Sequence, residues 1–264
     1  MGITLLPQVA PVDYEAPENQ TCVSSGSLAT TCATCPANEL SICAAVSRSV
    51  AKGPRNFGGA LLATTVHTVP ARKTICFPSD WSDNVQIVCQ GWAISSLTLS
   101  DGRRQILSFL LAGDMFSPVG PFASAPGRSV EAITDVTYRS FNRTQFKTIL
   151  FQHPEVMETL SKVWIDERWR ADQLALDLGR RTADERIARL ILSLRERLEK
   201  RNLTQNQTME FPLRQHHIAD ATGLTPVHVN KVLSDFRRSG LIEISNRTLT
   251  ILDLEEFRRV AGMR

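Results

Sequence analysis

The spacing of apolar residues changes at Pro154 from the pattern of strands to the period of a helix, and that change limits the folds this chain can adopt. Before Pro154, short runs of β-branched and aromatic residues alternate with turn signals, which is typical of antiparallel β-structure. The predicted strands are residues 64–69, 85–88, 92–99, 105–111, 130–133 and 136–141. After Pro154, apolar residues recur every three to four positions, the period of a helix. The sequence therefore predicts an α+β chain, with a barrel or sandwich of strands followed by helices.

Length and composition exclude several classes of protein. The chain has 264 residues, of which 42% are hydrophobic and 22% are charged, and both fractions are near globular averages. No apolar run reaches the roughly 18 residues that cross a bilayer, and the N-terminus lacks a basic start followed by an apolar core. We therefore expect a cytoplasmic protein with no membrane partner. Its formal charge of +3 is compatible with a polyanion partner without requiring one.

Residues 1–45 are expected to form a flexible leader that contains cysteines, because the first part of this segment is rich in Pro, Ser and Thr. Thiols stay reduced in the cytoplasm, so the six cysteines of the chain are not expected to form a disulfide framework. Cys32, Cys35 and Cys43 are spaced C-x2-C-x7-C, and such thiolates in a flexible loop can converge on an iron–sulfur cluster or zinc. Redox-reactive thiols without a cluster, or cysteines without a special role, are the alternatives.

Two helices are predicted after Pro154. In the first, residues at alternating spacings of three and four match the seam of a two-stranded coiled coil. The seam consists of Met157, Leu160, Trp164, Glu167, Ala171, Leu174 and Leu178. We interpret residues 153–180 as a dimerisation helix; the alternative is an amphipathic helix packed on its own barrel. The second helix begins at Thr182, which has capping-box spacing with Glu185, and residues 201–210 are expected to be a polar linker.

Residues 211–250 have the order of a winged helix-turn-helix. A short helix leads into a turn that contains Gly223, and the next helix starts with a capping residue, Thr225, and has Pro226 in its first turn. Two short strands then form the predicted wing. The strands are residues 241–245 and 248–251, joined at Asn246 and Arg247.

The second helix of this motif has a polar face suited to double-stranded DNA. Asn230 can pair with adenine, Lys231 can donate to guanine, and Val227 can touch a thymine methyl. The arginines near the motif suit phosphates, which position a protein without specifying sequence. The other candidate DNA contacts are Thr225, His228, Ser234, Arg214, Arg237, Arg238 and Arg247. The alternative is a protein-interaction scaffold that binds no DNA.

Together with the predicted barrel, this motif resembles the Crp/Fnr family of bacterial transcription regulators, in particular its FNR/FixK-like branch. The most specific pieces are residues 99–114 (LSDGRRQILSFLLAGD), residues 179–190 (GRRTADERIARL) and the helix-turn-helix. The resemblance, over residues 60–255, implies a sensor of the cyclic-nucleotide-binding type, a double-stranded β-helix or jelly roll, at residues 46–152. It also implies a winged helix at residues 181–264, and a homodimer that binds a palindromic operator and contacts RNA polymerase.

The residues expected to receive a signal depart from the cyclic-AMP receptors of this family. Those receptors hold the ribose with a Gly-Glu pair and the cyclic phosphate with a later Arg-Ser pair. Arg128 and Ser129 match the second pair, but Pro118 stands at the Glu position, and a proline cannot accept the ribose hydroxyls. We therefore do not expect cyclic AMP to be the signal. Arg128 can still meet another anion or form a surface or interdomain salt bridge.

The oxygen sensors of the family hold a four-iron cluster with N-terminal cysteines and one cysteine from the roll. Here Tyr138 stands where that later cysteine is expected, so the fourth ligand would be Cys22, with Cys89 or Cys76 as alternatives. The hypothesis is a regulator that responds to redox state or oxygen through a 4Fe-4S cluster. The alternative is a regulator without a cluster that responds to a small ligand or a protein.

Two further expectations concern activity and operator. The sequence shows no recognisable set of a nucleophile, a base and a group that orients the base, so we expect no enzymatic activity. The oxygen sensors of the family typically contact DNA with a Glu-x-x-Ser-Arg set. The matching residues here, Val227, Asn230 and Lys231, all differ, which predicts a different operator sequence.

Overall fold

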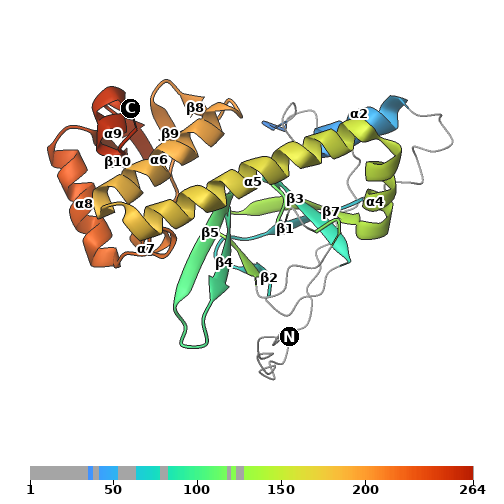
Figure 1. The fold of residues 1–264 in the computed structure, drawn as a ribbon, viewed down its shortest axis with the longest axis horizontal. Helices are drawn as coiled ribbons and strands as arrows, with labels where there is room; N and C mark the ends of the chain where they lie inside the picture. Colours follow the sequence, from blue (N-terminus) through green and yellow to red (C-terminus); the bar gives the residue numbers. More distant parts are fainter. Residues whose placement is uncertain are drawn as a thin grey trace, which may run out of the picture.

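A long helix, α5 (Pro154–Arg180), organises the structure, with a β-roll along it and a second group of helices near its C-terminal end (Figure 1). The structure is a computed structural model. It describes residues 35–37, 42–52, 64–77, 83–117, 120–122 and 128–263. None of the helices within these ranges is both long and apolar enough to cross a bilayer.

The roll consists of two antiparallel sheets, ordered β1-β7-β3 and β2-β6-β4-β5 in the described part of the chain. Its strands are β1 (Thr64–Val69), β2 (Thr74–Cys76), β3 (Asn84–Gln90), β4 (Ala93–Thr98), β5 (Arg104–Leu110), β6 (Arg128–Ala132) and β7 (Val136–Asn142). The predicted α+β class and the double-stranded roll are confirmed. β2 was not predicted, because a three-residue strand is too short to show alternation.

Side chains from both sheets fill the space between them. Val88 and Val136 from one sheet meet Leu110 and Val130 from the other in a single buried cluster. The alternation of apolar and polar residues that predicted the strands places these side chains inward. The turn before β4 requires a glycine, because Gly91 has a φ of +90° and an added Cβ would lie 2.1 Å from the Asp135 carbonyl oxygen.

Three helices pack together beside the β1-β7-β3 sheet. They are α2 (Ile42–Lys52), α4 (Arg143–Gln152) and the first turns of α5, and they share a buried cluster with Ile87 and Phe141. α2 begins inside the predicted leader, so Cys43 lies on a helix and not in a flexible loop. Ile42, Ala45 and Val46, at helical spacing, are buried in this cluster, where α2 packs along α5, and this burial stabilises a helix that composition alone did not indicate.

The coiled-coil seam predicted on α5 is only partly available to another chain. Leu160 is fully buried in the cluster of its own roll, and Met157 and Trp164 pack against that cluster. The first half of the helix therefore packs on its own barrel, as the alternative interpretation held. Ile165, at 67% exposure, and Trp169, at 61%, lie on a different face of α5. The spacing of apolar residues could not distinguish the chain's own roll from a partner helix.

The C-terminal part is a winged helix, as predicted. It contains α6 (Ala183–Glu199), α7 (Gln215–Thr222), α8 (Pro226–Arg238), β10 (Ile242–Ser245), β11 (Thr248–Ile251) and α9 (Leu254–Val260). The capping box is present at the start of α6, where the Thr182 backbone N–H donates to Glu185 Oε2 at 2.7 Å.

Residues 201–210 are not the polar linker that was predicted. They form β8 (Thr204–Gln205) and β9 (Thr208–Glu210), and β9 pairs with β11, so the wing belongs to a sheet of order β10-β11-β9-β8. The segment is polar because most of its side chains are exposed, but Met209 is 2% exposed and anchors β9. Two apolar residues, Leu203 and Met209, in a polar run are too weak a pattern to predict a strand.

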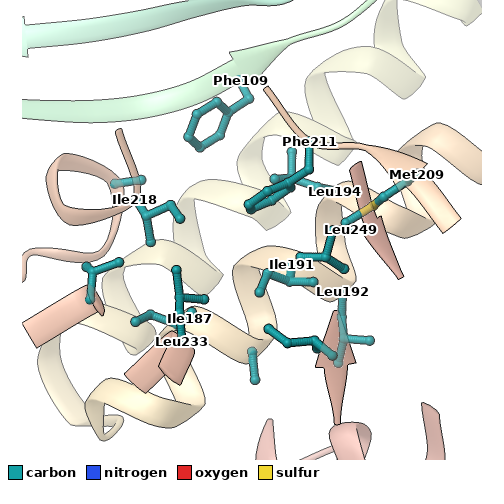
Figure 2. Packing of buried hydrophobic residues seen from close by; sticks show 14 of the residues in the cluster. Phe109, Ile187, Ile191, Leu192, Leu194, Met209, Phe211, Ile218, Leu233 and Leu249 are labelled. Carbon is teal, nitrogen blue, oxygen red and sulfur yellow. The ribbon is translucent and has the colours of Figure 1, made fainter. Parts of the chain in front are cut away.

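A single hydrophobic core extends from the roll into the winged helix. Figure 2 shows Phe109 of β5 directed toward Ile218 of α7 and Phe211, with Leu194 of α6 nearby. Trp92 of the roll belongs to the same cluster. The position of the winged helix relative to the roll is thus set by packing within one chain as well as by α5.

Candidate nucleic-acid interface

The helix-turn-helix is built as its sequence predicts. α7 ends at Gly223, which has a φ of +66° in the left-handed region. Thr225 caps α8, because its Oγ1 accepts a hydrogen bond from the His228 backbone N–H at 3.2 Å, and Pro226 occupies the first turn. The apolar stripe of α8 is buried, and it consists of Val229, Val232, Leu233 and Phe236.

The opposite face of α8 is open to solvent. Val227 is 80% exposed, and it lies with His228, Asn230 and Lys231, which are also exposed. Ser234 is half-buried and Thr225 is exposed. The structure therefore places the predicted base-contacting residues together on the first turns of one helix.

Side chains from neighbouring positions hold this face in place. Asn230 Oδ1 accepts a hydrogen bond from Gln215 Nε2, on α7, at 2.9 Å. Arg237 donates to the Ser234 hydroxyl at 3.2 Å. Gln215 was not predicted from the sequence. Its place in the first turn of the first helix, directly after Arg214, was the available signal.

The predicted phosphate-contacting arginines are spread around the motif. Arg214 caps α7, Arg237 and Arg238 lie in the last turn of α8, and Arg247 lies in the wing turn with a φ of +63°. All four are exposed, and Arg238 pairs with Asp235. The Phe211 backbone N–H donates to the Arg247 carbonyl oxygen at 2.7 Å, which ties the wing turn to the segment leading into α7.

His217 is the buried member of the histidines near this surface. It is 5% exposed, and its Nδ1 accepts a hydrogen bond from the Arg214 backbone N–H at 3.1 Å. Burial, reinforced by the neighbouring His216 and Arg104, lowers the pKa of His217 to about 4. His217 is therefore neutral near pH 7 and contributes no charge to DNA binding.

The pair predicted to meet an effector lies between the roll and α5. Arg128 Nη1 is 3.7 Å from Glu167 Oε1 on α5, and the Ser129 hydroxyl is 3.0 Å from the Ser96 hydroxyl. Burial raises the pKa of Glu167, while Arg128 and Arg170 act in the opposite direction. Arg128 thus forms a salt bridge between two parts of the chain, which was the alternative interpretation of this residue. Pro118 lies outside the described residues.

The predicted cysteine ligands are not brought together within the described residues. Cys22 and Cys32 lie outside them. Cys35 and Cys43 are half-buried thiols, and no group of three or more His, Cys, Asp or Glu in the described ranges could hold a metal ion. The Cys76 Sγ lies 3.7 Å from Gln86 Oε1, and the Cys89 Sγ lies 3.9 Å from the Ile87 carbonyl oxygen.

Tyr138, which stands where a roll cysteine was expected, has a packing role. Its ring stacks on His67 with centroids 4.9 Å apart and contacts Phe116. Burial raises the pKa of its hydroxyl to about 12. The position is therefore filled by an uncharged aromatic side chain.

A sensor-like roll, a long helix and a winged helix with an open polar face define a DNA-binding transcription regulator. Residues 185–260 match the Crp-like helix-turn-helix domain, and residues 66–153 match the cyclic nucleotide-binding domain. The chain belongs to the Crp/Fnr family of transcription regulators.

Relatives and solved structures agree with this assignment. The chain is 32% identical to the transcriptional activator protein FnrL of Cereibacter sphaeroides, over 73% of this chain and 78% of that protein. It is 32% identical to the nitrogen fixation regulation protein FixK of Rhizobium meliloti, over 80% of this chain and 92% of the relative. The structure of FixK2 from Bradyrhizobium japonicum is similar with a TM-score of 0.67 and 29% identity, covering 75% of this chain and 98% of that one.

Proposed function

We propose that this chain is a sequence-specific regulator that binds a palindromic operator as a homodimer, with one α8 in each half-site. The observation that carries the proposal is the open polar face at the start of α8, opposite a fully buried apolar stripe. A recognition helix contacts base edges with its N-terminal residues. Val227, Asn230 and Lys231 occupy those positions.

The proposed contacts divide into two kinds. Asn230 and Lys231 supply the hydrogen bonds that distinguish adenine and guanine in the major groove, and Val227 supplies an apolar contact. The arginines, together with Thr225, His228 and Ser234, supply contacts that position the helix. Because Gln215 already donates to the Asn230 carbonyl oxygen, the Asn230 amide is held in one orientation before DNA binds, with its NH2 group free to donate.

The dimer in this proposal forms along α5. Ile165, Trp169 and Leu176 are large apolar residues, 67%, 61% and 43% exposed. Their spacings of four and seven place them on one side of a helix. A second copy of α5 would cover this stripe. Contact with RNA polymerase is part of the same proposal, supported by the similarity to a transcriptional activator.

The signal in this proposal is redox state or oxygen, received by the N-terminal cysteines. Cys22, Cys32, Cys35 and Cys43 provide four thiolates, the donor type that iron–sulfur clusters require. A 4Fe-4S cluster held there would supply an oxygen-labile centre. An absorption spectrum of protein purified without oxygen tests this: a brown band that bleaches in air supports the cluster, and colourless protein without iron or sulfide favours a thiol or small-ligand signal.

Cyclic AMP fits this proposal poorly. Glu167 lies beside the Arg128 guanidinium, so an anionic ligand would have to compete with a carboxylate of the chain itself. The cluster-free alternative, a small ligand or protein signal, is favoured over the cluster only if the anaerobic protein contains no iron.

Selection of binding sites from random DNA tests the contacts to bases. We expect Asn230→Ala and Lys231→Ala each to cost about 1–3 kcal/mol at one base position of the selected operator and much less on other sequences. Arg247→Ala is the matched control. It should weaken binding to all sequences alike and reduce the salt dependence, because it removes a phosphate contact. Equal loss on every sequence for all three variants would contradict the proposed base contacts.

A further inference from the structure

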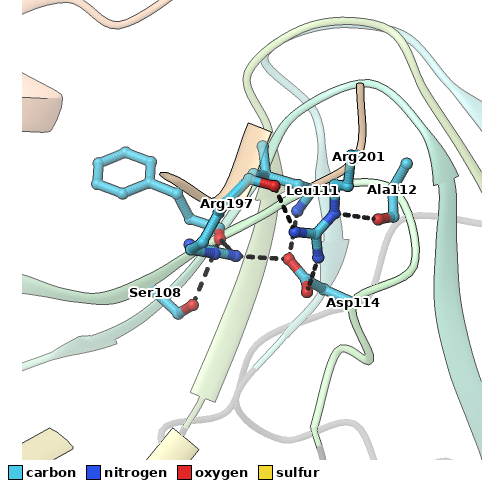
Figure 3. Close-up of polar contacts among 7 residues, drawn as sticks. Ser108, Leu111, Ala112, Asp114, Arg197 and Arg201 are labelled. Atoms are coloured by element: carbon cyan, nitrogen blue, oxygen red, sulfur yellow. Dashed lines mark hydrogen bonds and ion pairs between the residues drawn. The ribbon is translucent and has the colours of Figure 1, made fainter. Parts of the chain in front are cut away.

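A buried cluster of charged side chains joins the roll to the winged helix. Asp114, in the turn after β5, accepts hydrogen bonds from Arg197 Nη2 at 2.6 Å and from Arg201 Nη2 at 2.7 Å (Figure 3). Arg197 lies in the last turn of α6, and Arg201 lies two residues beyond its end. We call these three residues the latch. Their side chains are 17%, 12% and 11% exposed, respectively.

The same two arginines also bind the backbone of the roll. Arg197 Nη2 donates to the Phe109 carbonyl oxygen at 2.7 Å, and Arg201 Nε donates to the Ala112 carbonyl oxygen at 2.7 Å. The Leu111 backbone N–H donates to Asp114 Oδ2 at 2.7 Å. Each guanidinium thus binds the Asp114 carboxylate and a backbone carbonyl group of β5 or of the turn that follows it, and such planar, multiple contacts fix direction as well as distance.

The charged form of Asp114 is stabilised by the two arginines of the latch. Burial alone would raise the pKa of Asp114, but the opposing effect of Arg197 and Arg201 leaves it below its ordinary value. Removing one member of a buried ion pair leaves its partners without compensation. The contact is therefore sensitive to any change that moves the turn after β5 relative to α6.

A second set of contacts holds α7 to the same strand. Arg104 of β5 pairs with Glu131 of β6 at 2.8 Å and with Asp220 of α7 at 2.9 Å. Gln105, also on β5, donates to the Ala221 carbonyl oxygen at 3.2 Å. β5 and its following turn therefore hold two helices of the winged helix, α6 through the latch and α7 through Arg104.

α8 is connected to these held helices by one short turn. α8 starts three residues after Gly223 closes α7, so a roll that holds α6 and α7 also fixes the direction of α8. In this arrangement the polar face of α8 stays exposed. We propose that the latch holds each recognition helix in its DNA-binding direction, and so sets the half-site spacing that a dimer accepts. The inference about spacing rests on the homodimer of the proposed function.

Asp114→Asn tests this proposal, with Asp101→Asn as the matched control. Asp101 makes the same kind of ion pair, with Arg103 at 2.8 Å, but its side chain is 52% exposed and lies at the tip of the β4–β5 hairpin. Two measurements are made on the full-length protein. Hydrogen exchange reports the mobility of residues 105–117 and 195–203. DNA binding is measured on palindromes whose half-sites are separated by different numbers of base pairs.

For Asp114→Asn we expect exchange at both segments to rise at least tenfold, affinity for the preferred operator to fall at least tenfold, and the preference for one spacing to be lost. Asp101→Asn should match wild type in all three. Faster exchange with unchanged affinity and spacing preference overturns the proposal, as does unchanged exchange. Tighter DNA binding by Asp114→Asn also overturns the proposal, because the latch would then hold α8 away from its DNA-binding direction.

Two controls separate this outcome from other failures. Asp114→Glu keeps the charge but lengthens the side chain by one methylene, so it should remain folded by circular dichroism and prefer a different spacing. An unchanged spacing preference for Asp114→Glu counts against the latch even if Asp114→Asn does not fold. Wild-type protein that is monomeric contradicts the proposed dimer, whereas dimeric wild-type protein that binds all spacings equally contradicts the latch.

Discussion

His217 occupies the start of α7 with its ring almost entirely buried. Its Nδ1 is an acceptor for the Arg214 backbone N–H, which satisfies one of the donors that a helix leaves unpaired at its N-terminus. A protonated ring could not accept this bond. Burial lowers the pKa of His217 to about 4. Burial and the hydrogen bond therefore both favour the neutral ring.

This environment predicts a dependence of stability on pH. The unfolded chain protonates His217 below about pH 6.5, whereas the folded chain does so only near pH 4. The free energy of unfolding should therefore fall as the pH is lowered from 6.5 to 4, by at most about 1.4 kcal/mol per pH unit from this group. His217→Gln keeps an acceptor at this position, and in urea unfolding it should lose less stability over this range than wild type. His228→Gln, at an exposed site, should behave as wild type; equal slopes for all three proteins would contradict the assignment.

The helices of the winged helix begin and end at residues whose side chain or backbone conformation favours a helix end. Thr182 and Thr225 cap α6 and α8, and Gly223 closes α7. The turn also contacts α5, because a Cβ added at Gly223 would lie 3.0 Å from Leu178 Cδ2. The helix-turn-helix is therefore packed on the end of the long helix as well as on β5.

A comparison of Gly240 with Gly223 distinguishes the cost of a left-handed backbone from the cost of the contact with Leu178. Gly240, after α8, has a φ of +67° and no atom within 4 Å of an added Cβ, whereas Gly223 has a φ of +66° and the Leu178 contact. Gly240→Ala should destabilise the fold by about 1 kcal/mol, the cost of a left-handed conformation. Gly223→Ala should cost about 2 kcal/mol, because Leu178 must also move. Chemical denaturation measures both, and equal losses would show that the Leu178 contact contributes nothing.

At the scale of the molecule, α5 presents two different sides. Its first turns complete the core of the roll through Val156 and Leu160, while Ile165, Trp169 and Leu176 remain exposed on another side. The roll and the winged helix share one core in addition. A change in the roll can therefore reach the recognition helix by two routes, along α5 and through the contacts of β5.

The division of α5 predicts different effects for two substitutions. Ile165→Glu places a charge in the proposed dimer stripe, so it should raise the dimer dissociation constant at least tenfold and leave unfolding of the monomer nearly unchanged. Leu160→Ala leaves a cavity in the core of the roll and should lower the free energy of unfolding by about 2–5 kcal/mol with little effect on association. Sedimentation and chemical denaturation measure the two quantities. The reverse pattern would support the seam predicted from the sequence alone.

Local patterns in the sequence predicted the strands of the roll other than β2, the wing, the caps and the helix-turn-helix. Alternation predicts β3 and β7, and Thr225, Pro226 and Gly223 each mark a helix end by their own backbone chemistry. Among the elements that were not predicted, α2 and β9 each depend on a few apolar side chains whose partners are distant in the chain. Ile42 packs beside the roll, and Met209 packs against the helices of the winged helix.

The sequence by itself determined the class of fold, the order of its parts and the residues that face outward from α8, because these follow from hydrophobic period, capping and turn chemistry within short segments. Only the tertiary structure decided that Leu160 faces its own roll, that Glu167 lies beside Arg128, and that Asp114 binds Arg197 and Arg201. These contacts join residues far apart in the chain, and their energies depend on burial and direction, which periodicity does not record.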